Sequence, residues 1–279
     1  MSLRTRLAEQ EILLALGAHD GLTARIAEAS GIEAIYHGGY ATAAHHFGLP
    51  DIGLVGLAEV TESVRRVRSA TSLPIIVDAD TGYGNEPNVR RTIEELERAG
   101  ADAVQIEDQV SPKRCGHMTG KQVIPRDEMV LKVRAAVGAR RNPETVIVAR
   151  TDALQVAGLD DAIARVNAYA EAGADVVFVD APQTVEQIAE IAQRTSTLLL
   201  ANASETGRSP SLPAAEYERL GYAVVIFPST QTWLFAKTYR ELCEAVLRDG
   251  TSLGLRERML SFDEVNELLR LNEWQKEET

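Results

Sequence analysis

Short apolar runs alternate with longer amphipathic stretches along the whole of this 279-residue chain. The runs have the length of buried β-strands, and the stretches between them carry apolar residues at helical spacing. Eight strands are predicted, at residues 12–16, 34–37, 74–80, 103–107, 145–150, 176–179, 198–202 and 223–227. A chain that repeats a strand and a helix in this way forms a parallel sheet covered by helices, because parallel neighbours need a crossover connection.

The stretches between the strands predict helices. In residues 88–99, the apolar residues Val89, Ile93 and Leu96 recur on one helical face. Further helices are predicted at residues 22–29, 126–137, 159–172, 185–194 and 214–220. Three helices are followed by a glycine at the expected stop position: Gly100, Gly173 and Gly221.

The repeat defines the fold class. The unit Ala-Gly-Ala-Asp precedes a predicted strand at residues 99–102 and again at residues 172–175. Eight strand–helix units predict an α/β protein with a (β/α)8 TIM-type barrel. The alternative, an open doubly wound sheet, is disfavoured because no glycine-rich dinucleotide or P-loop fingerprint follows a strand.

A single domain is expected over residues 1–279, with residues 250–279 as a C-terminal helical extension. Apolar residues at helical spacing continue after the eighth strand, through residues 233–248 and 253–277. Because a barrel does not need this segment, we expect it to pack on a neighbouring surface or subunit.

The net charge and the cysteine content limit the partners and the location that can be expected for this protein. A formal net charge of −12 argues against nucleic acid as a partner, because a phosphate backbone needs a basic face. No apolar run approaches the roughly 18 residues of a membrane span, and we expect no secretory signal at the N-terminus. The two cysteines, Cys115 and Cys243, are too few for a disulfide framework, so a cytoplasmic location is expected.

Carboxylates follow the third and fourth predicted strands, at the rim where barrel enzymes have their active sites. Asp78 and Asp80 are two residues apart, so on a strand they would point to the same face. Glu107 and Asp108 end the fourth strand. One such acid alone would more often cap a helix or pair with an arginine, but four together suit Mg²⁺, with Mn²⁺ as an alternative.

A basic, glycine-containing loop follows the fourth strand. Its residues 113–117 read Lys-Arg-Cys-Gly-His, and Gly120 and Lys121 come soon after. Cationic neighbours favour the thiolate form of Cys115 and attract carboxylates; the alternative is a surface thiol on a solvated loop. Cys243 lies in an apolar segment, residues 242–247, and is predicted to be a core residue.

Other strand ends also carry polar groups. Arg150 ends the fifth predicted strand and could hold a carboxylate through two parallel hydrogen bonds. Gly38, Gly39 and Tyr40 follow the second strand, where free backbone N–H groups could bind an anion. The sixth and seventh strands add Asp180, Asn202 and Glu205.

These segments resemble the isocitrate lyase/phosphoenolpyruvate mutase superfamily, and the loop at residues 113–117 is similar to the signature of its lyase branch. The resemblance runs from about residue 17 to residue 274. It implies a Mg²⁺-dependent carbon–carbon lyase that cleaves a 2-hydroxy-dicarboxylate, such as a substituted malate or a methylisocitrate, to a 2-oxo acid and a carboxylic acid. Phosphonomutase, phosphonopyruvate hydrolase and oxaloacetate hydrolase chemistry are alternatives on the same scaffold.

The resemblance also implies residue roles and an assembly. The implied metal site comprises Asp78, Asp80 and Glu107, with Asp51 near it through water. The implied catalytic residues are Cys115 as the acid, together with His117, Lys113, Arg114 and Arg150. The implied substrate-binding residues are Gly38, Gly39, Tyr40, Asp180, Asn202 and Glu205. The implied assembly is a homotetramer in which the last helix swaps between subunits.

Several positions depart from the family pattern. Gly38 stands where relatives usually have serine, and Asp180 stands where glutamate is usual. His45 and His46 replace small or apolar residues, which we attribute to packing. The loop also lacks the His-Arg-Pro-Asn continuation of the 2-methylisocitrate lyases, so recognition of a third substrate carboxylate is not expected. Because of these departures, the resemblance does not determine the identity of the substrate.

Overall fold

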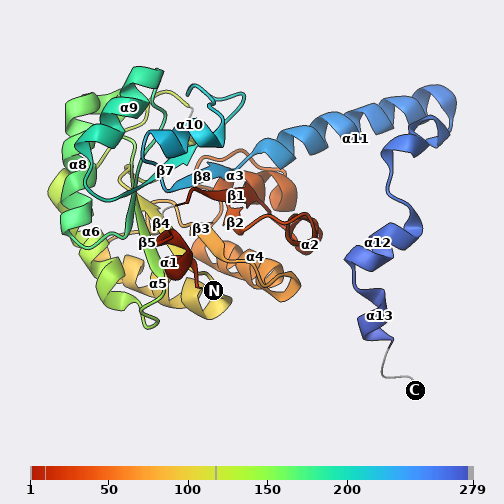
Figure 1. Ribbon diagram of the computed structural model, residues 1–279, viewed down its shortest axis with the longest axis horizontal. Coiled ribbons are helices and arrows are strands. Elements are labelled where there is room, and N and C mark those ends of the chain that lie inside the picture. Colours follow the sequence, from red (N-terminus) through yellow and green to blue (C-terminus); the bar gives the residue numbers. More distant parts are fainter. Residues whose placement is uncertain (1, 10, 117, 276–279) are drawn as a thin grey trace.

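Eight parallel strands close into a barrel in chain order, which confirms the predicted fold class (Figure 1). The computed structural model describes residues 2–9, 11–116 and 118–275. The strands are β1 (Leu13–Gly17), β2 (Ala34–His37), β3 (Ile75–Asp78), β4 (Ala103–Glu107), β5 (Val146–Thr151), β6 (Val176–Val179), β7 (Leu198–Asn202) and β8 (Val224–Phe227). Since all run the same way, their carboxyl ends share one rim, and the register places Glu107 of β4 opposite Arg150 of β5.

Helices surround the barrel (Figure 1). They are α1 (Leu3–Leu7), α2 (Gly21–Ala29), α3 (Gly39–Thr42), the π-helix η1 (Ala43–Phe47), α4 (Leu57–Ala70), α5 (Glu86–Ala99), α6 (Arg126–Ala139), α7 (Leu154–Ala157), α8 (Leu159–Glu171), α9 (Val185–Arg194) and α10 (Ala214–Arg219). Local signals set their ends: Asp20 accepts a hydrogen bond from the Thr23 N–H at the start of α2, and Gly100 ends α5 with φ 102°. The sequence prediction placed no helix between β2 and β3, where α3, η1 and α4 lie.

Two apolar layers hold the barrel together. Side chains alternate along each strand, so Ile76 and Val148 fill the barrel interior while Val77 and Ile147 pack against the helices. Phe178 of β6 is 1% exposed in the inner layer. Truncating such a ring to alanine typically costs about 3–5 kcal/mol of stability. The strand ends that form the rim are therefore held by a closely packed core.

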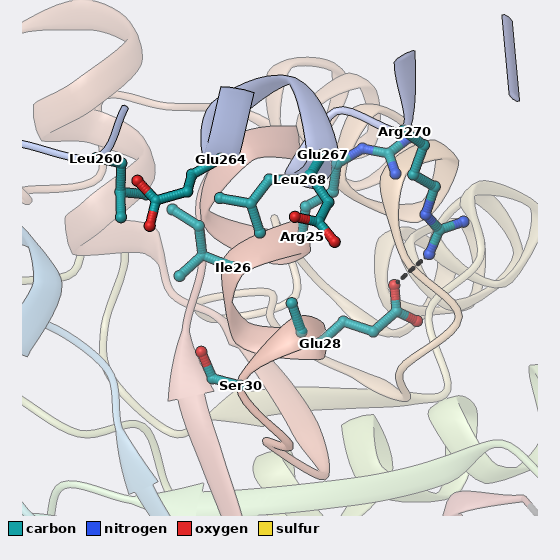
Figure 2. A pocket seen from close by; sticks show the side chains of 10 residues that line it. Arg25, Ile26, Glu28, Ser30, Leu260, Glu264, Glu267, Leu268 and Arg270 are labelled. Atoms are coloured by element: carbon teal, nitrogen blue, oxygen red, sulfur yellow. Dashed lines mark hydrogen bonds and ion pairs between the residues drawn. The ribbon is translucent and has the colours of Figure 1, made fainter. Parts of the chain in front are cut away.

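The C-terminal segment leaves the barrel along α11 (Thr230–Asp249), which extends away from the other helices (Figure 1). The chain continues through η2 (Leu253–Arg258), α12 (Phe262–Leu268) and α13 (Leu271–Trp274). Figure 2 shows α12 and the following turn beside α2, where Arg270 lies 3.0 Å from Glu28 at a cavity of about 510 Å³. Within the described residues, no helix has the length and apolar character needed to cross a membrane.

Cys243 is exposed, so its prediction as a core residue was wrong. It lies on α11, and Leu247 one turn further along that helix is 87% exposed. The apolar pattern of this helix does not face the barrel core.

Candidate active site

Two carboxylates come together where β3 ends, although not by the geometry that strand alternation predicts. β3 ends at Asp78, and Asp80 lies beyond it in a left-handed turn with φ 48°, so the same-face argument was wrong for Asp80. The Asp80 N–H instead donates to Asp78 Oδ1 over 3.1 Å. Gln105 Nε2 also donates to that oxygen, at 3.3 Å. The turn brings both acids into the site.

Lys113 lies among these acids. Its Nζ is 2.6 Å from Asp51 Oδ1 and 2.8 Å from Asp80 Oδ1, and its side chain is 5% exposed. Burial, together with the carboxylates of Asp78 and Asp51, raises the pKa of Asp80 to about 7 despite Lys113. Burial also raises the pKa of Glu107. We call Asp51, Asp78, Asp80 and Glu107 the acid cluster; Lys113 does not balance its charge.

The acid cluster fits a hard divalent cation. Its donors are carboxylate oxygens, which Mg²⁺ prefers, and Glu107 Oε1 is buried with no hydrogen-bond partner in the described part of the chain. In the same residues, no three His, Cys, Asp or Glu side chains converge on a common metal position. Because Lys113 Nζ lies between Asp51 and Asp80, a cation bound there would require this ammonium to move aside.

Asp108 is not part of the acid cluster, contrary to the sequence interpretation. It follows Glu107, the last residue of β4, and its side chain turns towards α8. Its Oδ2 accepts hydrogen bonds from the Thr151 hydroxyl at 2.6 Å and the Tyr169 hydroxyl at 2.7 Å, and pairs with Arg165 at 3.1 Å. Asp108 therefore ties β4 to β5 and α8 behind the site.

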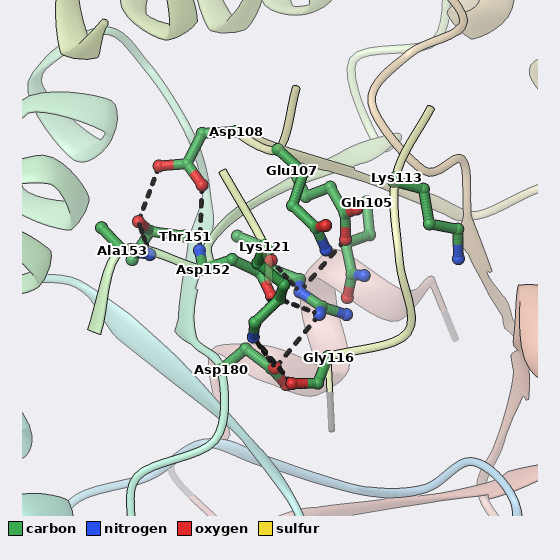
Figure 3. A network of polar contacts seen from close by, with 12 residues as sticks. Gln105, Glu107, Asp108, Lys113, Gly116, Lys121, Thr151, Asp152, Ala153 and Asp180 are labelled. Carbon is green, nitrogen blue, oxygen red and sulfur yellow. Dashed lines mark hydrogen bonds and ion pairs between the residues drawn. The ribbon is translucent and has the colours of Figure 1, made fainter. Parts of the chain in front are cut away.

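Arg150 stands at the centre of a second group of buried charges. Figure 3 shows the other members of this group, Lys121, Asp152 and Asp180. It binds Asp152 through Nε at 2.8 Å and Nη2 at 2.9 Å, while Nη2 also lies 3.1 Å from Asp180. Lys121 Nζ reaches the same two acids, Asp152 at 2.7 Å and Asp180 at 3.4 Å. Although burial opposes it, the charges of Arg150 and Lys121 lower the pKa of Asp152. We call these four residues the Arg150 network.

The two groups meet at Glu107. Arg150 Nε lies 3.2 Å from Glu107 Oε2, so the guanidinium pairs with one acid of the acid cluster. Arg150 also lies over the Phe178 ring at 5.4 Å. Its place is therefore set by three acids and one ring before any substrate binds.

The loop that carries Cys115 is tied down at several points. A bridge between Gln109 and Val123 closes its base. The Gln109 amide exchanges hydrogen bonds with the Arg114 backbone, at 2.8 and 3.0 Å, and the Cys115 N–H donates to the Asp51 carbonyl at 3.1 Å. These bonds place Cys115 beside the acid cluster.

A cavity of about 50 Å³ joins the acid cluster, the Arg150 network and the loop. Ten of the residues expected at the site line it: Gly38, Gly39, Tyr40, Asp51, Asp78, Lys113, Cys115, Arg150, Asp180 and Asn202. Gly39 begins α3, and a Cβ there would lie 3.3 Å from Asp80 Oδ1. The first turn of α3, whose leading N–H groups have no partner within the helix, thus adjoins the acid cluster.

Two expected site residues, Arg114 and Glu205, are placed differently, and a third is not among the described residues. Arg114 is exposed and donates to the Thr119 carbonyl at 3.3 Å. Glu205 is exposed and accepts hydrogen bonds from the Thr230 hydroxyl at 2.7 and 2.9 Å. His117 lies outside the described residues.

Sequence reasoning missed Asp152 and Lys121 as members of the site. Asp152 follows Arg150 by two residues at the same rim, which was the available signal for it. Lys121 was noted in the sequence as a cation of the Cys115 loop, but its contacts with Asp152 and Asp180 could not be predicted because they span 31 and 59 residues.

Comparison with known proteins identifies the family. Residues 3–247 match the family model described as phosphoenolpyruvate phosphomutase. A 2,3-dimethylmalate lyase of Eubacterium barkeri is 41% identical over 269 residues, which cover 96% of this chain and 93% of that protein. A 2-methylisocitrate lyase of Aeropyrum pernix is 39% identical over 274 residues, covering 98% and 88%.

Solved structures agree with these sequence matches. A crystal structure of 2,3-dimethylmalate lyase superposes with a TM-score of 0.92 at 36% identity, covering 98% of this chain and 92% of that one. Oxaloacetate acetylhydrolase in complex with 3,3-difluorooxalacetate gives 0.92 at 32%, covering 99% and 94%. Phosphonopyruvate hydrolase in complex with oxalate and Mg²⁺ gives 0.89 at 28%, covering 99% and 98%.

Proposed function

This chain belongs to the phosphoenolpyruvate mutase/isocitrate lyase superfamily, and from that premise we propose that it is a carbon–carbon lyase for a small 2-hydroxy-dicarboxylate. The observation that carries the proposal is the position of Cys115, which lines one cavity with Asp78 of the acid cluster and with Arg150. Relatives named as 2,3-dimethylmalate lyase and 2-methylisocitrate lyase support the reaction type.

The proposed reaction breaks the C2–C3 bond of the substrate. The 2-hydroxyl loses its proton and becomes the carbonyl of the 2-oxo acid, while the electron pair of the broken bond stays on C3. The Cys115 thiol then donates its proton to C3 and so completes the carboxylic acid product. Lys113, at the acid cluster, and Arg150 supply positive charge for the carboxylate whose negative charge grows during cleavage.

We assign Asp78, Asp80 and Glu107 to a Mg²⁺ site, with Asp51 beside it and Mn²⁺ as a substitute. The hard oxygen donors and the buried, unpartnered Glu107 Oε1 support this assignment. A bound cation would supply Lewis acidity to the hydroxyl and carboxylate oxygens of the substrate. The first turn of α3, from Gly38 to Tyr40, and Asn202 bind the substrate, and His117 assists Cys115.

Three kinds of substrate are candidates. A cavity of about 50 Å³ has room for roughly one or two waters, so its size in this loop position does not choose among them. A short substituted malate is favoured by the similarity to 2,3-dimethylmalate lyase. Oxaloacetate is an alternative, supported by the fold similarity to oxaloacetate acetylhydrolase. Phosphonopyruvate is the third candidate, because the fold is also similar to that of phosphonopyruvate hydrolase.

A panel assay tests the function directly. Release of a 2-oxo acid is followed with 2,3-dimethylmalate, 2-methylisocitrate and other alkylmalates, and loss of substrate is followed with oxaloacetate and phosphonopyruvate. We expect turnover of at least one alkylmalate with Mg²⁺, and loss of that turnover in EDTA that returns when Mg²⁺ is restored. Turnover of oxaloacetate or phosphonopyruvate alone would replace the lyase proposal with the corresponding alternative.

We also propose a homotetramer in which the C-terminal helices swap between subunits. This segment exposes large apolar side chains, among them Leu247 at 87%, Phe262 at 82% and Trp274 at 78%, and exposed apolar patches of this kind are typical of interfaces. Light scattering should give four times the 30.4 kDa chain mass; a mass of one chain would contradict the proposal. A reducing cytoplasm fits the need to keep Cys115 as a thiol.

A further inference from the structure

A buried lysine outside the proposed catalytic set connects the Cys115 loop to the barrel. Lys121 has a side chain that is 1% exposed, and its Nζ donates to the Gly116 carbonyl at 2.7 Å (Figure 3). The same ammonium pairs with Asp152 at 2.7 Å and with Asp180 at 3.4 Å. Three acceptors thus match the three N–H groups of one ammonium.

The contact joins elements that are far apart in the sequence. Gly116 follows Cys115 in the loop, whereas Asp152 and Asp180 follow the ends of β5 and β6. Gly116 lies so close to these strand ends that a Cβ on it would be 2.0 Å from Asp180 Oδ2 and 2.5 Å from Arg150 Nη2. The loop therefore approaches the strand ends closely at Gly116, where Lys121 binds the backbone carbonyl.

We propose that Lys121 is a positioning residue that latches the Cys115 loop closed over the site. By binding the Gly116 carbonyl and two acids of the rigid rim at once, it holds Cys115 at the edge of the cavity. This inference rests on the proposed function, because only a catalytic Cys115 gives the latch a role in turnover.

The charge of Lys121 makes the latch strong. Burial disfavours an ammonium, but Asp180 and Asp152 raise the pKa of Lys121 above its ordinary value, so the group stays charged at neutral pH. Hydrogen bonds to a charged donor are stronger than those between neutral groups. Yet the cavity of about 50 Å³ is small, so substrate entry requires the loop to open. The latch therefore sets how often the loop opens.

The test measures loop opening through the thiol and does not need the substrate. The sequence has two cysteines, so Cys243→Ser leaves Cys115 as the only one in the full-length protein. The rate of Cys115 alkylation by iodoacetamide is measured by mass spectrometry from pH 6 to pH 9. In this background, Lys121→Met should raise the rate about tenfold or more at pH 9, where loss of the Lys121 charge affects thiol ionisation least. A factor of ten corresponds to one lost charge-assisted hydrogen bond.

Matched variants separate the latch from general destabilisation. Lys132→Met removes another buried lysine, whose Nζ donates to the Thr81 carbonyl at 3.2 Å, and should leave the alkylation rate within about twofold of the parent. Lys121→Arg should restore most of the protection. If Lys121→Met does not fold, Lys121→Gln, which loses the charge, takes its place. Equal alkylation of the Lys121 variant and the parent would overturn the latch.

Turnover then separates this inference from the proposed function. If alkylation rises and kcat falls by about tenfold with KM changed less, the latch acts on the catalytic position of Cys115. If alkylation rises while turnover is unchanged, the latch stands and the acid role of Cys115 is wrong. If alkylation is unchanged while turnover falls, Lys121 acts in another way and the latch is wrong.

Discussion

The acid cluster and the Arg150 network lie side by side at the barrel rim, and they differ in charge balance. In the acid cluster, four carboxylates surround the single ammonium of Lys113. In the Arg150 network, Arg150 and Lys121 face Asp152 and Asp180, two cations against two anions, and Arg150 also pairs with Glu107 of the acid cluster. Buried acids with too little countercharge are typical of metal and ligand sites, whereas networks of paired buried charges also occur in purely structural roles.

The largest effect is expected from Asp80→Asn in the acid cluster. Turnover should fall by about 10⁴-fold, because a bound cation supplies several kcal/mol of stabilisation to the transition state. Thermal shift with and without Mg²⁺ should show that the variant no longer gains stability from the ion. Its stability without Mg²⁺ should change little, since burial and like charges oppose ionisation of Asp80. Asp127→Asn, at an exposed position on α6, is the control; a normal response to Mg²⁺ in Asp80→Asn would refute the metal role.

Cys115→Ser should lower turnover by about 10³-fold, since general acid catalysis contributes roughly 10²- to 10⁴-fold. Mg²⁺ affinity, measured by calorimetry, should not change, because Cys115 is not a proposed ligand. Cys243→Ser on the exposed face of α11 is the matched control and should behave as the parent. Full activity of Cys115→Ser would exclude the thiol as the acid.

Asp152→Asn should break the balance of the Arg150 network. It leaves two buried cations with less countercharge, which should lower the free energy of unfolding by about 3 kcal/mol. Urea denaturation measures the loss. Asp160→Asn, which removes a largely exposed partner of Arg194, should cost less than about 1 kcal/mol. Similar losses in both variants would show that the network does not hold the structure.

A smaller, pH-dependent effect is expected at His37, the last residue of β2. Burial lowers its pKa to about 4, although the charge of Asp78 acts the other way. Because the ordinary pKa is about 6.5, the unfolded chain binds more protons between these values, and stability is lost as pH falls from 6.5 towards 4. At pH 5 this amounts to ~2 kcal/mol. His37→Gln should remove that loss of stability, while the two proteins should differ little in pH dependence above pH 7.

The comparison of the parent with His37→Gln also tests how strongly the charge of Asp78 affects the protonation of His37. If the charge of Asp78 dominated over burial, the parent would instead be stabilised on acidification relative to His37→Gln. Denaturation curves from pH 4.5 to pH 8 show whether acidification lowers or raises the stability of the parent relative to His37→Gln.

The strand and helix pattern was predictable because it depends on local spacing. β2, β4, β6 and β7 have the predicted bounds, and the other strands differ from their predicted bounds by at most two residues at either end. α3 and η1 were missed because glycines and a proline interrupt the apolar pattern at residues 38–56. α4 was missed although Val60, Val64 and Val67 recur at helical spacing. Asp78, Glu107 and Arg150 were found at the site because strand ends of a parallel barrel must share one rim.

The sequence by itself determined the barrel, the polar rim and the loop that carries Cys115, because hydrophobic periodicity and residue type are properties of short segments. Only the tertiary structure decided which charges meet. It turned Asp108 away from the acid cluster, brought Asp80 in through a left-handed turn, and set Lys113 between Asp51 and Asp80. It also joined Lys121 to Asp152 and Asp180. Such pairings depend on distances across the closed barrel and on burial, which no local pattern encodes.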